Sequence, residues 1–567
     1  MRPTLTSTEQ LNGAVAETTP SDTEGTASDR SMAVAKAWLQ QCEDEHPSCR
    51  RVELGRLPKR VIEVGSVSTE PRIYVSVRER LPYAALSYCW GPHENIRLLS
   101  TNIDAYTRCL PFAALPRTIG DAILVARSLG VKYLWVDSLC ILQDSEEDLK
   151  QEVSYMDEIY ANTWFTIAAK DSPSCTSGLF HRRNWPTSAI IPTEIRMPSL
   201  VIQQKTLIRD RAVNARTSCK NRLMALPRHY VYKPSADENT PVLETRAWTL
   251  QEELLSPRML KCGVNELSWT CSKCSCTERN PEAESTASRQ KWQYAVKRVL
   301  VTGFDNHGNL NRVDKEQVFN YWLEIVEDYL RRKLSKQRDK LAALAGCQRA
   351  IGKVLEDFPI AGLWARQFFA PSILWCVDNR RNDNLVISFR CPSWSWAFTS
   401  RPVNYIRHPS GTDDSRPWVW HHEVKYYPEL VSWVVDDSGL HGIDGHMTVR
   451  CKLLREASLD CERYLVKDFL NAPPKSRGGK EAIHFETRHD FEDAAAISDP
   501  WLMLVRTNQF IPGTKDRGYK YDIETHLLRL EKTSPDRADF RRIGLVITKS
   551  WANKWLSSAT EKTIRLF

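Results

Sequence analysis

Three short apolar runs alternate with two helix-like segments between Tyr83 and Ala169, and this alternation restricts the fold more than any other feature of the chain. The runs are YAALSY (83–88), VKYLWV (131–136) and WFTIAA (164–169), and each is typical of a buried strand. The segments between them carry apolar residues at the spacing of one helix face. Strands that alternate with helices favour parallel pairing with helical crossovers. The sequence therefore predicts an α/β core with a parallel sheet.

Both expected helices begin with a capping pattern. Thr118 is followed three residues later by Asp121, and Ser145 is followed at the same spacing by Asp148. Each pair resembles a capping box in which aspartate replaces the usual Glu or Gln. Gly130 stands where the first helix should end, and a glycine there can adopt the left-handed conformation of a C-cap.

Polar residues follow each of the three expected strands. The segments are Ser87–Gly91, Asp137–Cys140 and Ser172–Gly178. In an open sheet of parallel strands, ligands usually bind beyond the carboxyl ends of the strands. We therefore expect these three segments to gather at one edge of the sheet, where a ligand could bind.

Five separated blocks of the chain resemble the HET domain of fungal heterokaryon-incompatibility proteins. Their order and spacing are also similar to those of the family, although Asp148-Leu149 stands where an Asp-Trp pair is often found. The blocks are YAALSYCWG (83–91), LPRTIGDAI (115–123), YLWVDSLCILQD (133–144), MDEIYANTWFTIAA (156–169) and RAWTLQEELLSPRML (246–260).

The resemblance implies a role in non-self recognition after cell fusion, ending in growth arrest or programmed cell death. Some family members lie in metabolic gene clusters, so an accessory role in metabolism is an alternative. The HET domain is also distantly similar to TIR domains, which implies a TIR-like or flavodoxin-like sheet. Some TIR domains hydrolyse NAD with a glutamate beside the sheet, so NAD is a candidate substrate, although a shared fold does not determine an activity. The competing expectation is a non-enzymatic module that self-associates or binds a protein partner.

The resemblance and the local patterns divide the chain into five parts. Residues 1–32 are rich in Thr, Ser, Glu and Gly and are expected to form a disordered tail. Residues 33–79 predict a helix and two short strands, and residues 80–262 form the expected HET domain. A helical, Trp-rich extension follows over 263–410, with PSWSWAF (392–398) as a strand-like run. Residues 411–567 are expected to be β-rich.

Composition excludes several classes of partner. The net charge is +8, but the 78 basic and 70 acidic residues are interleaved, so we expect no nucleic-acid partner. No apolar run approaches the roughly 20 residues that span a bilayer, and the N-terminal residues lack the apolar core of a secretory signal. The 16 cysteines are then expected to be reduced thiols in the cytoplasm or nucleus.

Glu152 is the residue most like a catalytic carboxylate, because it borders the apolar stripe of the second helix. A half-buried glutamate beside a sheet could orient a ribose hydroxyl or stabilise an oxocarbenium-like centre. Alternatively, Glu152 is a boundary residue that pairs with Lys150 or a neighbouring helix. Asp137 ends a strand and could hold a ligand hydroxyl or cap the turn that follows.

The segment RAWTLQEELL (246–255) predicts a helix that turns polar groups toward the core. Trp248, Gln251 and Glu252 share one face, and buried polar groups there need partners. Arg246 or Arg258 could pair with Glu252, either within a pocket or across to the sheet. The alternative is that Thr249 and Glu252 form a capping box at the start of the helix.

The first strand ends in side chains that could line a pocket. Ser87 and Cys89 are candidate nucleophiles, but the chain has no G-x-S-x-G elbow and His93 is near only in sequence. We therefore do not expect covalent catalysis. Tyr88 and Trp90 could stack on an adenine or nicotinamide ring, although aromatic residues at such positions are more often part of the core.

Two groups of candidate zinc ligands lie far apart in the sequence. One is Cys42-x3-His46-x2-Cys49, and the other is Cys271-x2-Cys274-x-Cys276, to which Cys262 could add a ligand. Structural zinc sites normally have four protein ligands, and neither group is complete by itself. The sequence alone therefore leads us to expect no metal.

Overall fold

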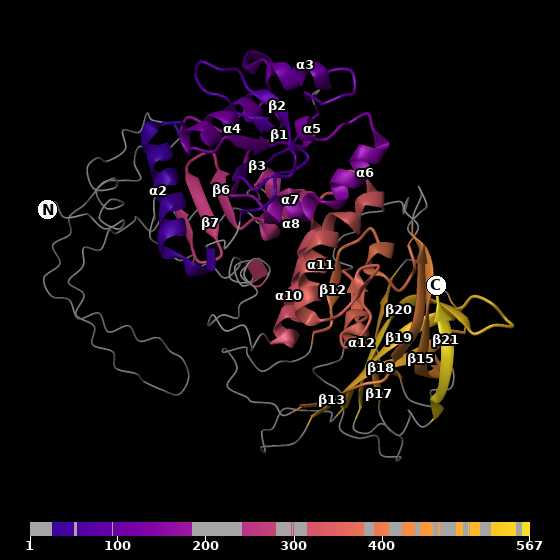
Figure 1. Ribbon diagram of the computed structural model, residues 1–567. Helices are drawn as coiled ribbons and strands as arrows, with labels where there is room; N and C mark the ends of the chain where they lie inside the picture. Colours follow the sequence, from indigo (N-terminus) through magenta and orange to yellow (C-terminus); the bar gives the residue numbers. More distant parts are fainter. Residues whose placement is uncertain are drawn as a thin grey trace, which may run out of the picture.

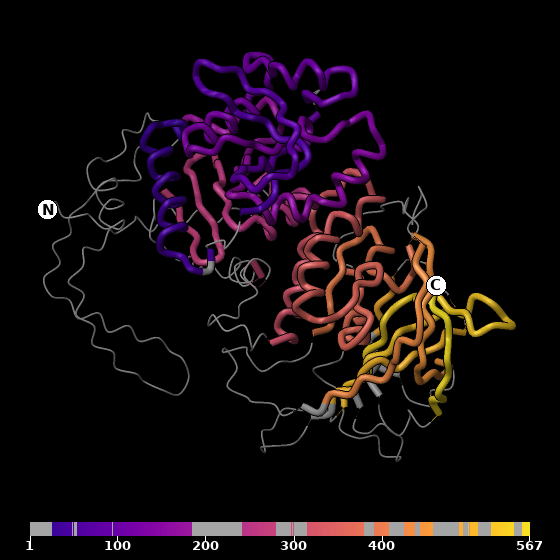
Figure 2. Tube along the Cα trace, in the orientation of Figure 1, coloured from indigo at the N-terminus to yellow at the C-terminus, as the bar shows by residue number. Residues whose placement is uncertain are grey.

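The structure is a computed structural model that describes most of the chain. The described residues are 25–49, 54–92, 95–183, 241–278, 296–297, 299, 314–378, 391–407, 422–436, 443–456, 463–464, 483–490, 497, 499–510, 523–550 and 558–567. An α/β region coloured indigo to magenta and a β-rich region coloured orange to yellow lie on either side of a helical segment, residues 314–378, that contacts both (Figure 2). The first of these contains the segments with HET-like sequence.

A mixed eight-stranded sheet forms the centre of the α/β region. Strands β4, β3, β5 and β6 are parallel neighbours, as the sequence predicts, and the strands outside them are antiparallel. The order across the sheet is β2 (Arg72–Val75), β1 (Arg60–Glu63), β4 (Tyr133–Trp135), β3 (Tyr83–Ser87), β5 (Phe165–Ala168), β6 (Arg258–Cys262), β7 (Leu267–Cys271) and β8 (Ser275–Thr277).

The strand order creates a switch point between β3 and β5. From β3 the chain crosses to β4 on one side and then returns to β5 on the other side. At such a point the connections leave the sheet in opposite directions, which opens a crevice at the carboxyl ends of the strands.

Helices cover the sheet from different sides (Figure 1). Helix α4 (Arg117–Ser128) packs on β3 and β4 and contacts α2 (Asp29–Glu45), which in turn contacts β7. Helices α7 (Met156–Ala161) and α8 (Trp248–Leu255) pack against each other and against α11 (Ala342–Leu355).

The two predicted capping patterns have different outcomes. Ser145 accepts a hydrogen bond from the Asp148 N–H at the start of α6 (Glu146–Ser154), which confirms that cap. The prediction for Thr118 is wrong, because α4 begins at Arg117 without a side-chain cap. The Thr118 hydroxyl donates to Ser174 O and accepts from the Gly178 N–H instead.

Gly130, at the end of α4, has a φ of 75°, which confirms the predicted left-handed conformation.

The segment after the eight-stranded sheet is helical, with short strand pairs. Helices α10 (Lys315–Arg331) and α11 agree with the helical character that the sequence predicts for this segment. The strand predicted at PSWSWAF is wrong: a turn leads into η6 (Trp396–Phe398), where Ser395 accepts from the Ala397 N–H. Local capping by this serine outweighs the strand preference of the tryptophans.

A nine-stranded sheet forms the β-rich C-terminal region, where the sequence predicts β-structure. Its strands are β13 (His422–Tyr426), β14 (Glu429–Asp436), β15 (Asp444–Arg455), β16 (Arg463–Tyr464), β17 (Ile483–His489), β18 (Trp501–Phe510), β19 (Ile523–Lys532), β20 (Asp539–Ser550) and β21 (Thr560–Leu566).

Shorter elements complete the described parts of the chain. The helices are η1 (Pro47–Cys49), α3 (Ile103–Arg108), η2 (Phe112–Ala114), α5 (Asp137–Cys140), η4 (Val242–Thr245), η5 (Gln337–Asp339) and α12 (Phe369–Ser372). The strands are β9 (Pro359–Ile360), β10 (Leu363–Trp364), β11 (Trp375–Val377) and β12 (Val403–Tyr405). Among the described helices, none combines the length and apolar composition that crossing a membrane requires.

Candidate functional site

The three segments that follow the parallel strands lie together at one edge of the sheet. The Trp90 indole N–H donates to Asp137 Oδ2 at 2.9 Å, which joins the ends of β3 and β4. The Cys175 N–H donates to Trp90 O at 3.1 Å and adds the segment after β5. Each strand ends in the same region, so the local hydrogen bonds connect segments about 50 to 85 residues apart in the chain.

Tyr88 is anchored rather than exposed for stacking. Its hydroxyl donates to Ser138 Oγ at 3.0 Å and accepts from the Asn95 amide at 2.7 Å. Its main-chain oxygen accepts from Arg246 Nη1 at 2.7 Å. The Tyr88 ring is therefore part of the wall that positions the polar groups beside it.

Burial strongly perturbs the Glu252 carboxyl group at this edge. Burial raises its pKa to about 7, against the opposing effects of the Ser87 hydroxyl and the Arg246 guanidinium. Helix α8 positions it, because Gln251 and Leu255 on the same helix are buried. A carboxyl group with a pKa near neutrality can both donate and accept a proton at physiological pH.

The hydroxyls beside Glu252 differ in their hydrogen bonding. Tyr160 O–H donates to Leu86 O at 3.2 Å, and burial followed by the Glu252 charge raises its pKa. Ser87 Oγ is fully buried and close enough to Glu252 to lower its pKa, but it makes no hydrogen bond of ordinary geometry within the described part of the chain. An unpaired buried hydroxyl is costly and is characteristic of sites that receive a ligand or a water molecule.

A small cavity of about 10 Å³ opens beside Ser87, enough for the centre of one water molecule. It is lined by residues of β3, β5, β6, η4 and α8 and by Lys170, which follows β5: Ser87, Ala168, Lys170, Leu243, Glu244, Thr249, Glu253, Met259 and Lys261. Glu253 contacts Lys261 at 2.5 Å. Burial raises the Glu253 pKa, but the charges of Lys261 and Arg332 outweigh it and bring the value to about 2.

Glu152, the predicted catalytic residue, is buried in a different set of neighbours. Its side chain is 1% exposed, and Oε1 has no hydrogen-bond partner within the described ranges. Burial raises its pKa, Arg60 lowers it and Asp148 raises it further. The charges of Arg60 and Asp148 therefore act on Glu152, whereas Ser87, Arg246 and Asp137 act on Glu252.

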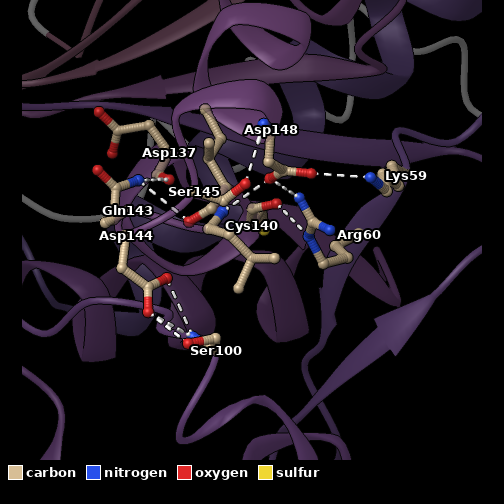
Figure 3. A network of polar contacts seen from close by, with 11 residues as sticks. Lys59, Arg60, Ser100, Asp137, Cys140, Gln143, Asp144, Ser145 and Asp148 are labelled. Atoms are coloured by element: carbon tan, nitrogen blue, oxygen red, sulfur yellow. Dashed lines mark hydrogen bonds and ion pairs between the residues drawn. The ribbon is translucent and has the colours of Figure 1, made fainter.

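A polar network fixes the connection between β4 and α6 (Figure 3). Asp148 lies between Arg60, with which it forms a buried ion pair, and Lys59, which contacts it at 2.8 Å. Gln143 donates to Asp137 O at 3.1 Å, and Asp144 accepts from Ser100 Oγ at 2.6 Å. These contacts give Gln143 and Asp144 structural roles in the loop.

The remaining predicted pocket residues have structural partners. Gln251 accepts from the Gly346 N–H at 2.8 Å and joins α8 to α11. Trp248 is partly buried against the core, and the predicted alternative for this helix is wrong: Thr249 forms no capping box, because its hydroxyl donates to Leu243 O and Arg246 O. Burial raises the pKa of the Cys89 thiol, which reduces its thiolate fraction.

Asp137 is held at the junction of β3 and β4. Besides Trp90, its carboxylate accepts from the Ser138 N–H at 2.7 Å, as the turn-capping alternative expects. Burial raises its pKa.

Three residues of this edge were missed by sequence reasoning. Tyr160 repeats the spacing of an apolar helix stripe, so its hydroxyl gives no separate signal. Ser138 and Asn95 likewise resemble ordinary loop residues, and only the fold brings them to Tyr88.

The fold joins the two groups of candidate metal ligands. Atoms of Cys42, His46, Cys49 and Cys271 all lie within 4.8 Å of one another, and the four residues are buried. Cys274 Sγ lies 3.6 Å from Cys271 Sγ, and Cys276 Sγ is 3.7 Å from Cys274 Sγ. Cys262 lies on β6, outside this four-residue group.

Fold and site together define an α/β protein with a buried polar cluster at the switch point of its sheet. Residues 83–252, which span that cluster, match the family model described as heterokaryon incompatibility protein (HET). The chain therefore carries a HET domain, as the five sequence blocks predict. Neither the curated proteins nor the solved structures include a significant match to the chain.

Proposed function

We propose that this protein acts in fungal non-self recognition and cell-death signalling, and that its HET domain does so by hydrolysing NAD. The HET match supports the biological role. The parallel order β4-β3-β5-β6 supports a TIR-like or flavodoxin-like core. The observation that carries the chemical part is Glu252, whose pKa of about 7 and position beside Ser87 suit proton transfer or charge stabilisation.

In this proposal, the bond between nicotinamide and ribose breaks and water supplies the new C–O bond. Nicotinamide leaves as a neutral base, and the proton from water passes to the carboxylate or to solvent. The ionised carboxylate stabilises the positive charge that develops on the ribose. Glu252 is the carboxylate that the surroundings favour, and Glu152 is the competing assignment.

Substrate entry requires rearrangement, because a cavity of about 10 Å³ is far too small for a dinucleotide. The lining includes Leu243 and Glu244, which precede α8, so outward movement of this segment would widen the cavity. Family resemblance to TIR domains, many of which act only when clustered, suggests that self-association drives this opening.

The test measures nicotinamide release from NAD by the full-length protein, both as dilute monomer and under conditions that cluster it. We expect release by wild type, a loss of about 100-fold or more in Glu252→Gln, and little change in the matched control Glu158→Gln, an exposed residue on α7. If Glu152→Gln lost nicotinamide release and Glu252→Gln kept it, the catalytic carboxylate would be Glu152 and not Glu252. Absence of release from clustered wild type would end the enzymatic proposal.

A second candidate is a non-enzymatic interaction module, and strand β14 favours it. Val431, Trp433 and Val434 are 49%, 45% and 57% exposed, which is unusual for apolar residues on one strand. Within the described parts of the sheet, β14 pairs with β15 only. Self-association without nicotinamide release would support this candidate, whereas an accessory role in a metabolic pathway requires neither.

A further inference from the structure

We propose that Cys42, His46, Cys49 and Cys271 bind a structural zinc ion that fastens helix α2 to the eight-stranded sheet. Three ligands come from the end of α2 and the following η1, and the fourth comes from β7. The site lies within the α/β region but involves neither Glu252 nor Glu152, so it is independent of the proposed activity.

Distances within the cluster fit a tetrahedral ion. Zinc binds cysteine sulfur at about 2.3 Å and histidine nitrogen at about 2.0–2.1 Å, so the edges of the tetrahedron are about 3.8 Å between sulfurs and about 3.6 Å between sulfur and nitrogen. His46 Nδ1 lies 3.5 Å from Cys271 Sγ and 4.0 Å from Cys49 Sγ. The four candidate ligand atoms all lie within 4.8 Å of one another.

Neighbouring groups stabilise thiolates at this position. The N–H groups of Lys273 and Cys274 both donate to Cys271 Sγ at 3.3 Å. The Arg258 Nε–H donates to Cys42 Sγ at 3.3 Å, and the same guanidinium binds Cys49 O at 2.9 Å. Zn²⁺ with three thiolates carries one net negative charge, which the buried Arg258 balances. Such outer partners orient metal ligands and tune their basicity.

The ligand chemistry selects zinc over other ions. Three soft sulfur ligands and one imidazole in a closed, buried arrangement are typical of structural zinc, whereas calcium and magnesium prefer oxygen ligands. A disulfide is the other fate of clustered cysteines, but Cys42, Cys49 and Cys271 are all free thiols.

Zinc here would connect parts of the chain that lie far apart. Cys271 and His46 are separated by 225 residues, and α2 contacts β7 beside the cluster. Ligands supplied by both elements would hold the helix against the sheet, and the binding free energy would add to the stability of the folded state.

The experiment measures metal by mass spectrometry in the full-length protein purified without chelator. We expect about one zinc ion per chain in wild type, and at least a tenfold lower content in Cys42→Ser and in Cys271→Ser. Two matched controls are Cys262→Ser, a buried cysteine on the neighbouring strand β6, and Cys274→Ser, whose sulfur lies beside the cluster. Both controls should retain the zinc.

A second measurement covers variants that fail to fold. Wild-type protein loaded with Co²⁺ should show the visible bands of tetrahedral cobalt and the charge-transfer absorption of cobalt bound to thiolates. Wild type without zinc and without these bands would overturn the proposal. Zinc retained in Cys42→Ser, or lost in Cys274→Ser, would overturn the assignment of these four ligands.

Discussion

Two buried carboxyl groups of the α/β region, Glu252 and Asp148, have pKa values shifted in opposite directions. Both lose hydration, which raises the pKa, and their partners decide the net result. Lys59, the Leu142 N–H and Arg60 outweigh burial at Asp148 and lower its pKa. Burial dominates at Glu252, where Ser87 and Arg246 compensate only in part. Asp148 therefore stabilises the fold as an ion, whereas Glu252 destabilises it when ionised.

This difference predicts how stability depends on pH. The Glu252 pKa is about 7 in the folded state and 4.5 in its reference state, so the folded protein binds more protons between these values. The stabilising contribution is present below pH 4.5 and is lost as pH rises through the folded pKa. A shift of this size corresponds to about 3 kcal/mol. Relative to Glu252→Gln, wild type should therefore lose up to about 3 kcal/mol of unfolding free energy from pH 5 to pH 8.

Urea denaturation of both proteins at several pH values measures this difference. The control is Glu158→Gln, which removes an exposed carboxylate from α7. A stability difference between wild type and Glu252→Gln that does not vary with pH would show that Glu252 is not protonated in the folded protein near neutrality.

At the level of elements, the glycines that follow β3 and α4 have the same backbone conformation but different surroundings. Gly91 has a φ of 79° and Gly130 a φ of 75°. A Cβ on Gly91 would lie 2.8 Å from Ser174 Cα, whereas none of the described heavy atoms lies within 4 Å of a Cβ on Gly130. Gly130→Ala should therefore cost about 1 kcal/mol for the backbone alone. Gly91→Ala should cost clearly more, because the segment after β5 must shift.

Thermal unfolding of the two variants checks this prediction. Equal losses of stability in the two variants would mean that the segment containing Ser174 moves without a cost in free energy. That result would argue against a rigid connection between the ends of β3 and β5.

Sequence patterns predict the elements of the core well, because each pattern has a local cause. YAALSY, VKYLWV and WFTIAA are buried strands, and Ser145 caps its helix. In both failures the threonine hydroxyl binds a backbone oxygen that the capping pattern does not include. Thr118 binds the segment 174–178, and Thr249 binds carbonyls of its own approach turn, although both show a capping pattern. Hydroxyl groups follow the nearest strong acceptor, and a local pattern cannot show which acceptor tertiary packing brings near.

At the scale of the whole molecule, the sites depend on segments that the sequence separates widely. The site around Glu252 combines Glu252 on α8 with Ser87 on β3. Residues 184–240, which lie between these elements in the sequence, are outside the described ranges. The candidate zinc ligands likewise come from α2 and η1 and from β7, which are far apart in the sequence. Residue types alone suggested both sets, but only the fold shows that Cys271 completes the first metal group while Cys262 does not. The sequence therefore could not predict which distant segments the fold brings together at these two sites.

A buried arginine is one of several contacts that join the β-rich region to the preceding segment. Arg542, on β20, is fully buried and contacts Asp490 at 2.7 Å. Its guanidinium donates to Ile373 O at 2.7 Å and to Trp375 O, and it lies 3.5 Å from the centroid of the Trp375 ring. Because Ile373 and Trp375 belong to the segment before the nine-stranded sheet, this side chain couples the two regions.

Replacing Arg542 should therefore separate the regions as well as destabilise the protein. Arg542→Leu leaves the Asp490 carboxylate buried without its charge partner, and breaking a buried ion pair costs about 3–5 kcal/mol. The adjacent Arg541 supplies a matched control, because it is 46% exposed and pairs with Glu531 at the surface, where such pairs contribute about 0–1 kcal/mol. Thermal unfolding should show a large loss of stability for Arg542→Leu but not for Arg541→Leu. Limited proteolysis should cleave the Arg542→Leu variant on the N-terminal side of the β-rich region. Similar losses in both variants would mean that the regions are held together mainly by apolar packing around Trp375 and its neighbours.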